Sequence, residues 1–141
     1  MSSAEHNPVA AFNQVLSEVI DLVQDVKQAH RKVPETHALH TELDQLFADL
    51  GSWARLLMDR DEALGISALA FMPSVAGRKP PNLWPGAISD GDARDLVADH
   101  LGRLEDHLSA ALAEQDEPGL RTALSEVEQG LRAHRQALAQ L

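Results

Sequence analysis

The stretches that decide the fold of this chain are PVAAFNQVLSEVIDLVQDVKQAHRKV at residues 8–33 and LRTALSEVEQGLRAHRQALAQL at residues 120–141. In each stretch, one set of residues recurs at alternating steps of four and three. The first set is Phe12, Leu16, Val19, Val23, Val26, His30 and Val33, and the second is Leu120, Leu124, Val127, Leu131, His134, Leu138 and Leu141. This spacing lines one face of a helix with side chains that pack against other helices. Both stretches therefore predict amphipathic helices, and a histidine takes one aliphatic position in each.

Two further stretches repeat this pattern. One carries Leu39, Leu43, Leu46, Leu50, Trp53 and Leu57, and the other carries Val97, Leu101, Leu104, Leu108, Ala111 and Leu112. Start signals precede all four stretches: Asn7-Pro8, Pro34-Glu35-Thr36, Ser89 followed by Asp92, and Asp116-Glu117-Pro118. Proline is tolerated in a first helical turn, and Asn or Ser side chains accept bonds from the free amide groups there. We expect helices at 8–32, 34–64, 89–112 and 118–141.

The composition agrees with one helical domain. The chain has 141 residues, of which 44% are apolar, and it contains no tyrosine. That apolar fraction is ordinary for a globular core, and a sequence rich in Leu and Ala favours helices over strands. We predict a single domain over 1–141, with a flexible N-terminus at 1–7 and a long crossover segment at 60–90.

Charge and cysteine content exclude several classes of function. A formal net charge of -10 argues against a nucleic-acid partner and against a membrane surface, since both attract basic proteins. With no cysteine, the chain has no disulfides, thiolate metal sites or cysteine nucleophile. The longest apolar run, Ala68–Met72, is too short to span a membrane, and residues 1–7 lack the features of a secretory signal. We therefore expect a cytoplasmic protein.

The connection at 60–90 bears on the bundle topology. It contains Pro73, Pro80, Pro81 and Pro85, and its roughly thirty residues are many for a turn between neighbouring helices. Simple alternation of helix directions needs only a short turn here, whereas an up-down-down-up order, as in ferritin-like folds, needs a crossover along the bundle. The length permits both topologies. We predict an antiparallel four-helix bundle and favour the crossover, because it accounts for the long connection.

The crossover would place His30, His40, His100 and His134 at one end of the bundle. Neutral imidazoles that converge from different helices could bind zinc or another divalent metal. Two other readings remain open: the rings fill an end layer of the core near helix C-termini, or a partly buried pair resists charging, so that acid loosens the bundle. No Glu-x-x-His pair occurs, and we expect no acid in the core stripes. We favour the structural reading and assign no metal ligand, cofactor-binding residue or catalytic residue.

The Pro-rich segment Arg78–Pro85 can act as a strap over the bundle, a contact for a partner, or a lid over a ligand. The sequence shows no nucleophile elbow and no phosphate-binding loop. The acidic runs Glu105-Asp106 and Asp116-Glu117 are expected on the solvated surface or at helix caps. We predict a non-enzymatic interaction or oligomerisation module, a homo-oligomer or a protein that binds a protein partner through Ala63–Trp84 and the helix at 8–32. The alternative is a ferritin-like metal-binding bundle that uses His30, His100, His134 and possibly His40.

Overall fold

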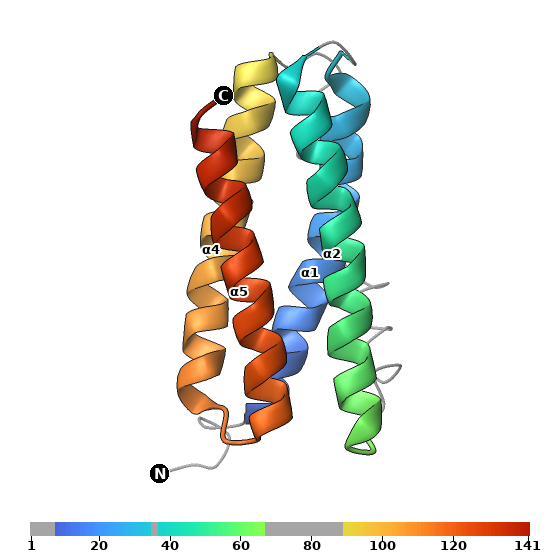
Figure 1. Cartoon of the computed structure of the whole chain (residues 1–141), viewed down its shortest axis with the longest axis vertical. Helices are drawn as coiled ribbons and strands as arrows, with labels where there is room; N and C mark the ends of the chain where they lie inside the picture. Colours follow the sequence, from blue (N-terminus) through green and yellow to red (C-terminus); the bar gives the residue numbers. More distant parts are fainter. Residues whose placement is uncertain (1–7, 35–36, 67–88) are drawn as a thin grey trace.

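The structure is a computed structural model that describes residues 8–34, 37–66 and 89–141 (Figure 1). Its helices are α1 (Pro8–Lys32), α2 (Ala38–Ala63), α4 (Asp90–Glu114) and α5 (Pro118–Ala139). No strand occurs within these three ranges. The predicted all-α fold with four helices is confirmed. None of the described helices is both long and apolar enough to cross a membrane.

The helices form a bundle in which each one packs against two neighbours. α1 contacts α2 and α4, and α5 contacts the same two helices. Along α4, His100 and then His107 pair with Asp25 and then Glu18 of α1, so these helices are antiparallel. Figure 1 shows α1 and α5 running in one direction and α2 and α4 in the other. The order of directions is therefore up, down, down, up. Most of the predicted crossover segment at 60–90, and all of the segment Arg78–Pro85, fall in residues 67–88, outside the described residues.

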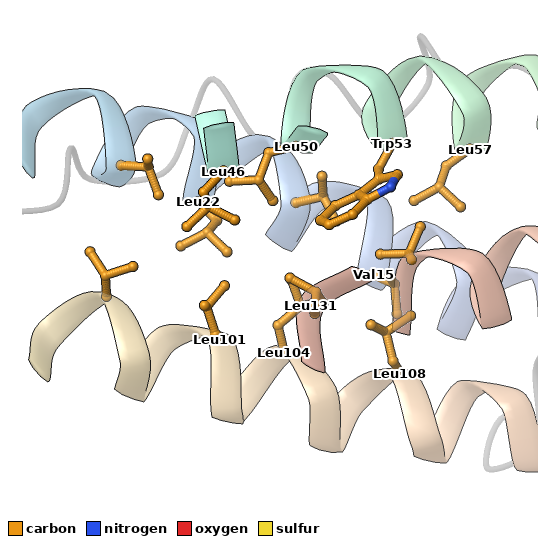
Figure 2. Packing of buried hydrophobic residues seen from close by; sticks show 14 of the residues in the cluster. Val15, Leu22, Leu46, Leu50, Trp53, Leu57, Leu101, Leu104, Leu108 and Leu131 are labelled. Carbon is orange, nitrogen blue, oxygen red and sulfur yellow. The ribbon is translucent and has the colours of Figure 1, made fainter. Parts of the chain in front are cut away.

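The interior is lined by the residues of the predicted stripes (Figure 2). Aliphatic side chains from all four helices form one buried cluster that also includes Phe12 and Trp53. In the predicted stripes, Val23 and Leu112 are partly exposed but still pack against this cluster. The prediction that Leu141 lines the interior is wrong: it lies beyond the end of α5 at Ala139 and is exposed. Burial of such side chains is the main favourable term in folding, at about 25 cal/mol for each Å² of apolar surface removed from water. The periodic apolar residues therefore account for the arrangement of the helices.

Side chains cap the starts of three helices. Ser89 caps α4, as predicted, by accepting a hydrogen bond from the backbone N–H of Asp92 at 3.0 Å. Glu117 caps α5 by accepting one from Leu120. α2 differs from the prediction: it begins at Ala38, and Nδ1 of His37 accepts the N–H of Leu39. An imidazole nitrogen takes the role of the usual cap oxygen here, and the helix starts four residues beyond the expected Pro34.

One glycine permits a close approach of α5 to α2. Gly130 lies beside the indole of Trp53, and a methyl group added at this glycine would overlap the ring. Trp53 itself is 8% exposed and faces the interior (Figure 2), as the sequence predicts. The absence of a side chain at residue 130 therefore makes room for the largest side chain of the core.

Candidate functional site

The four histidines predicted to share a layer do lie in one half of the bundle. His30 is near the end of α1 and His40 near the start of α2, while His100 and His134 occupy the corresponding halves of α4 and α5. Their rings do not converge, because most of them face carboxylates on neighbouring helices. The described part of the chain holds no group of three or more His, Asp or Glu side chains placed to bind a metal ion.

His134 is the most enclosed of the described histidines, and two acids of α2 face it. Its Nε2 lies 2.6 Å from Oδ2 of Asp49, and its Nδ1 lies 3.7 Å from Oε1 of Glu42. The edge of its ring also meets the indole of Trp53, with centroids 6.0 Å apart. This ring therefore does not fill a purely apolar layer.

His100 and His107 of α4 pair with two acids of α1. His100 Nδ1 lies 2.8 Å from Oδ2 of Asp25, and the side chains of this pair are only 17% and 5% exposed. His107 Nδ1 lies 2.7 Å from Glu18, but the ring of His107 is 55% exposed. The first pair is largely withdrawn from water, so its electrostatic interaction is screened less than that of the second.

His30 and His40 contact each other between α1 and α2. Their ring centroids are 3.9 Å apart, with the ring planes tilted by 35°. Nε2 of His30 lies 3.7 Å from Oδ1 of Asp44, which is beyond hydrogen-bonding distance. The structure thus brings together two of the four histidines of the alternative metal-binding reading, and directs the other two, His100 and His134, to separate carboxylates.

The pairs have a common position in the fold. We call α1 with α2, and α4 with α5, the two hairpins. The pairs of His100, His107 and His134 all join one hairpin to the other, and His37 at the start of α2 adds a contact of 3.6 Å with Asp90 at the start of α4. We call this set the histidine junction. The imidazoles therefore lie along the contact between the two hairpins rather than around one point.

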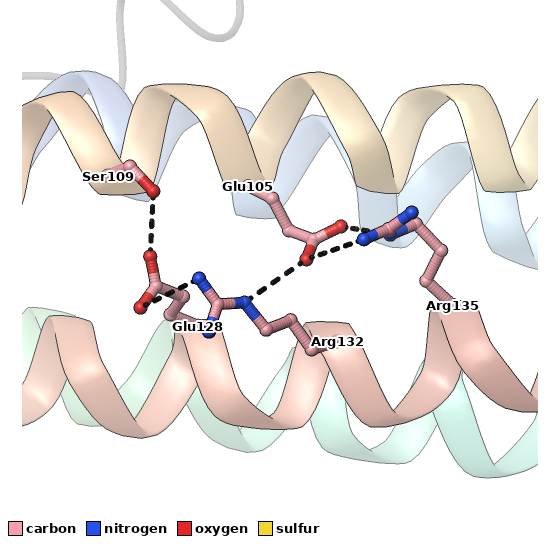
Figure 3. A network of polar contacts seen from close by, with 5 residues as sticks. All are labelled: Glu105, Ser109, Glu128, Arg132 and Arg135. Carbon is pink, nitrogen blue, oxygen red and sulfur yellow. Dashed lines mark hydrogen bonds and ion pairs between the residues drawn. The ribbon is translucent and has the colours of Figure 1, made fainter.

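Arginine, by contrast, joins α4 to α5 within one hairpin (Figure 3). Glu105 contacts both Arg132 and Arg135, and Arg132 also reaches Glu128, which accepts a hydrogen bond from Ser109. The prediction that Glu105 lies on the solvated surface is wrong, since it is only 7% exposed. Two arginines spaced by three residues lie on one face of α5 and extend across to this carboxylate, covering it with their own side chains.

Asp61 occupies the interior at the opposite end of the bundle. It is fully buried near the end of α2, and within the described residues neither of its carboxylate oxygens has a hydrogen-bond partner. Burial raises the pKa of the Asp61 carboxyl from 3.8 to about 6, because desolvation disfavours the charged form. The prediction that no acid occupies a core stripe is therefore wrong. The signal was available, because Asp61 follows Leu57 by one step of four.

Large exposed apolar side chains are few in the described part of the chain. They are Val9, Leu64 and Leu141, which are 39%, 47% and 43% exposed. Val9 is in the first turn of α1 and Leu64 caps the end of antiparallel α2, so both belong to the same end of the bundle. Leu141 belongs to the opposite end (Figure 1). We call the end that carries Val9 and Leu64 the apolar end.

Compared with known proteins, the sequence matches no protein-family model and none of the curated proteins.

Proposed function

We propose that this chain is a non-enzymatic, cytoplasmic interaction module that associates with a second copy of itself. The contact would involve α1 and the segment Ala63–Trp84. The alternative form of this proposal is a different protein that binds the same surface. The supporting observation is the apolar end, where Val9 and Leu64 are exposed at the point where that segment begins. Exposed apolar groups that gather at one place on a surface are typical of contact sites.

The polar contacts of the core give this proposal further support. His100, His134 and Glu105 each contact an oppositely charged side chain of a neighbouring helix. Such pairs fix the register of neighbouring helices, which is the role that a structural interaction module requires of them.

Light scattering on a sizing column tests self-association of the full chain over a range of concentrations. We expect the mass of a dimer, and we expect Leu64→Glu to shift the population to monomer because it places a charge in the contact. Leu141→Glu is the matched control: this leucine is equally exposed but lies at the other end, so the variant should remain dimeric. A wild-type chain that stays monomeric at every concentration contradicts self-association.

The second candidate is a metal-binding bundle, and the contact of His30 with His40 is the observation that favours it. Two neighbouring imidazoles, with Asp44 beside His30, provide donors that zinc accepts, although a closed zinc site needs four ligands. The metal content of protein purified without an affinity tag tests it. Bound metal that is lost in His40→Ala and retained in His107→Ala would support this candidate, and metal-free protein would contradict it.

A further inference from the structure

The two hairpins are joined by ion pairs of one chemical kind. In each described pair of the histidine junction, the group opposite the carboxylate is an imidazole: His100 with Asp25, His107 with Glu18, and His134 with Asp49. The arginine pairs of Glu105 instead lie inside the α4–α5 hairpin. Arginine keeps its charge at every physiological pH, whereas an unperturbed histidine titrates near pH 6.5. The described ion pairs between the hairpins therefore depend on a charge that changes near neutrality, whereas the arginine pairs of Glu105 do not.

We propose that the histidine junction is a pH-responsive contact between the two hairpins, which tightens as its imidazoles take up protons. A neutral imidazole forms an ordinary hydrogen bond with a carboxylate. A protonated one forms a charge-assisted bond, which is shorter and roughly twice as strong. Proton binding therefore favours the folded bundle in which the two hairpins are in contact.

The groups around His134 favour this change. From α2, Asp49 and Glu42 both face the ring, and both are acids. On the α4 side, Glu105 is held by Arg135, the residue that follows His134. The ring therefore meets two carboxylates from α2, and the nearby positive charge on its own helix is engaged by Glu105. Because Asp49 lies at 2.6 Å, a proton on this imidazole is shared directly with a carboxylate.

The surroundings of His100 are simpler. From α1, Asp25 faces the ring at 2.8 Å. In the antiparallel pair of α4 and α5, Glu105 contacts Arg135. His100 precedes Glu105 in α4, so the residues of α5 at the level of His100 are those that follow Arg135, residues 136–140. These five residues carry no charged side chain. The protonated ring would therefore meet the carboxylate of Asp25.

The stacked rings of His30 and His40 act in the opposite sense. They lie 3.9 Å apart and face one carboxylate, Asp44, so a second proton on this pair would place two like charges side by side. This contact joins α1 to α2 within one hairpin. It can lower the stability of that hairpin in acid without loosening the histidine junction.

The direction of the pH dependence follows from proton linkage. If the folded chain binds more protons than the unfolded chain, its stability rises as the pH falls. For the histidine junction, this rise is expected only while the imidazoles of the unfolded chain are still neutral, so it ends a little below about pH 6.5, where those imidazoles are protonated too. Asp61 adds a rise of the same sign, so the experiment uses the Asp61→Asn chain throughout to remove its titration.

Urea unfolding between pH 8 and pH 5.5, followed by circular dichroism, measures the number of protons taken up on folding. We expect uptake in the Asp61→Asn chain and a smaller uptake in each of the variants His100→Gln and His134→Gln. Glutamine keeps a hydrogen-bonding side chain but never carries a charge. If these variants fold poorly, Asp25→Asn and Asp49→Asn remove the carboxylates instead and should also reduce the uptake.

Arg132→Gln is the matched control, because it weakens a pair inside one hairpin while Arg135 still contacts Glu105. It should lower stability by a similar amount at every pH and leave the uptake unchanged. Fluorescence of Trp53 in a Trp84→Phe chain gives a local readout, since the indole contacts His134 at the junction. An uptake in the His100→Gln, His134→Gln double variant that equals the uptake of the Asp61→Asn chain would overturn the proposal.

Discussion

Replacement of Asp61 should stabilise the protein at neutral pH. The side chain is fully buried, and within the described residues neither oxygen is hydrogen-bonded. The pKa of its carboxyl rises from 3.8 to about 6, a shift of about 2 units. At 1.36 kcal/mol for each unit, the charged form costs the folded state up to about 3 kcal/mol. We therefore expect Asp61→Asn and Asp61→Leu to be more stable than the wild-type chain at pH 8.

The sign of the effect sets a pH window. The folded chain binds the proton of Asp61 more tightly than the unfolded chain, so the carboxyl carries no penalty below about pH 3.8. The penalty grows as the pH rises from there to about 6, and it is complete above that value. The difference in unfolding free energy between Asp61→Asn and wild type should accordingly grow by up to about 3 kcal/mol between pH 3.5 and pH 7.

Thermal and urea unfolding, monitored by circular dichroism, measure this difference. For a chain of this size, about 3 kcal/mol corresponds to a rise of roughly 10 °C in Tm. Glu62→Gln is the control, because this neighbouring carboxylate of α2 is exposed and its replacement should have little effect at any pH. A stability difference for Asp61→Asn that stays constant from pH 3.5 to pH 7 would refute the reasoning, since it would mean that burial does not penalise the charge.

Three further substitutions test the packing and the polar contacts, each by its Tm. Gly130→Ala should destabilise the fold by about 1–3 kcal/mol, because the added methyl group overlaps Trp53; Gly51→Ala, where nothing lies within 4 Å, should instead stabilise it by about 0.5–1 kcal/mol. Ser89→Ala should cost about 1 kcal/mol through loss of the cap of α4, and no change would show that water replaces the hydroxyl without penalty. Glu105→Gln should cost about 1–3 kcal/mol because it removes the negative charge that Arg132 and Arg135 contact, and a variant as stable as wild type would show that these contacts add no net stability.

Periodic burial made the helices and most of the core predictable. Residues such as Leu43, Leu104 and Leu131 have no other stable position than the shared interior, so their spacing alone indicates which face of each helix is buried. Helix ends were predictable where a side chain of a common capping type was present, as at Ser89. The start of α2 was not, because an imidazole at His37 is an uncommon cap.

The partners of the histidines could not be chosen from the sequence. The chain has 22 acidic residues, and which of them faces His100 or His134 depends on the register and rotation of the neighbouring helix. Glu105 was misassigned for a related reason: it lies beside the stripe residue Leu104, and the arginines that cover it belong to another helix. Periodicity indicates which face is buried but carries no information on the partner opposite.

The close approach of Gly130 to Trp53 also has a consequence for sequence variation. A bulky indole on α2 and a bare backbone on α5 fill the same space, so neither position can change in size alone without a void or an overlap. Among descendants of a common ancestor, residues 53 and 130 should therefore exchange volume in concert. A lineage that acquires leucine at the first position becomes free to accept alanine or serine at the second.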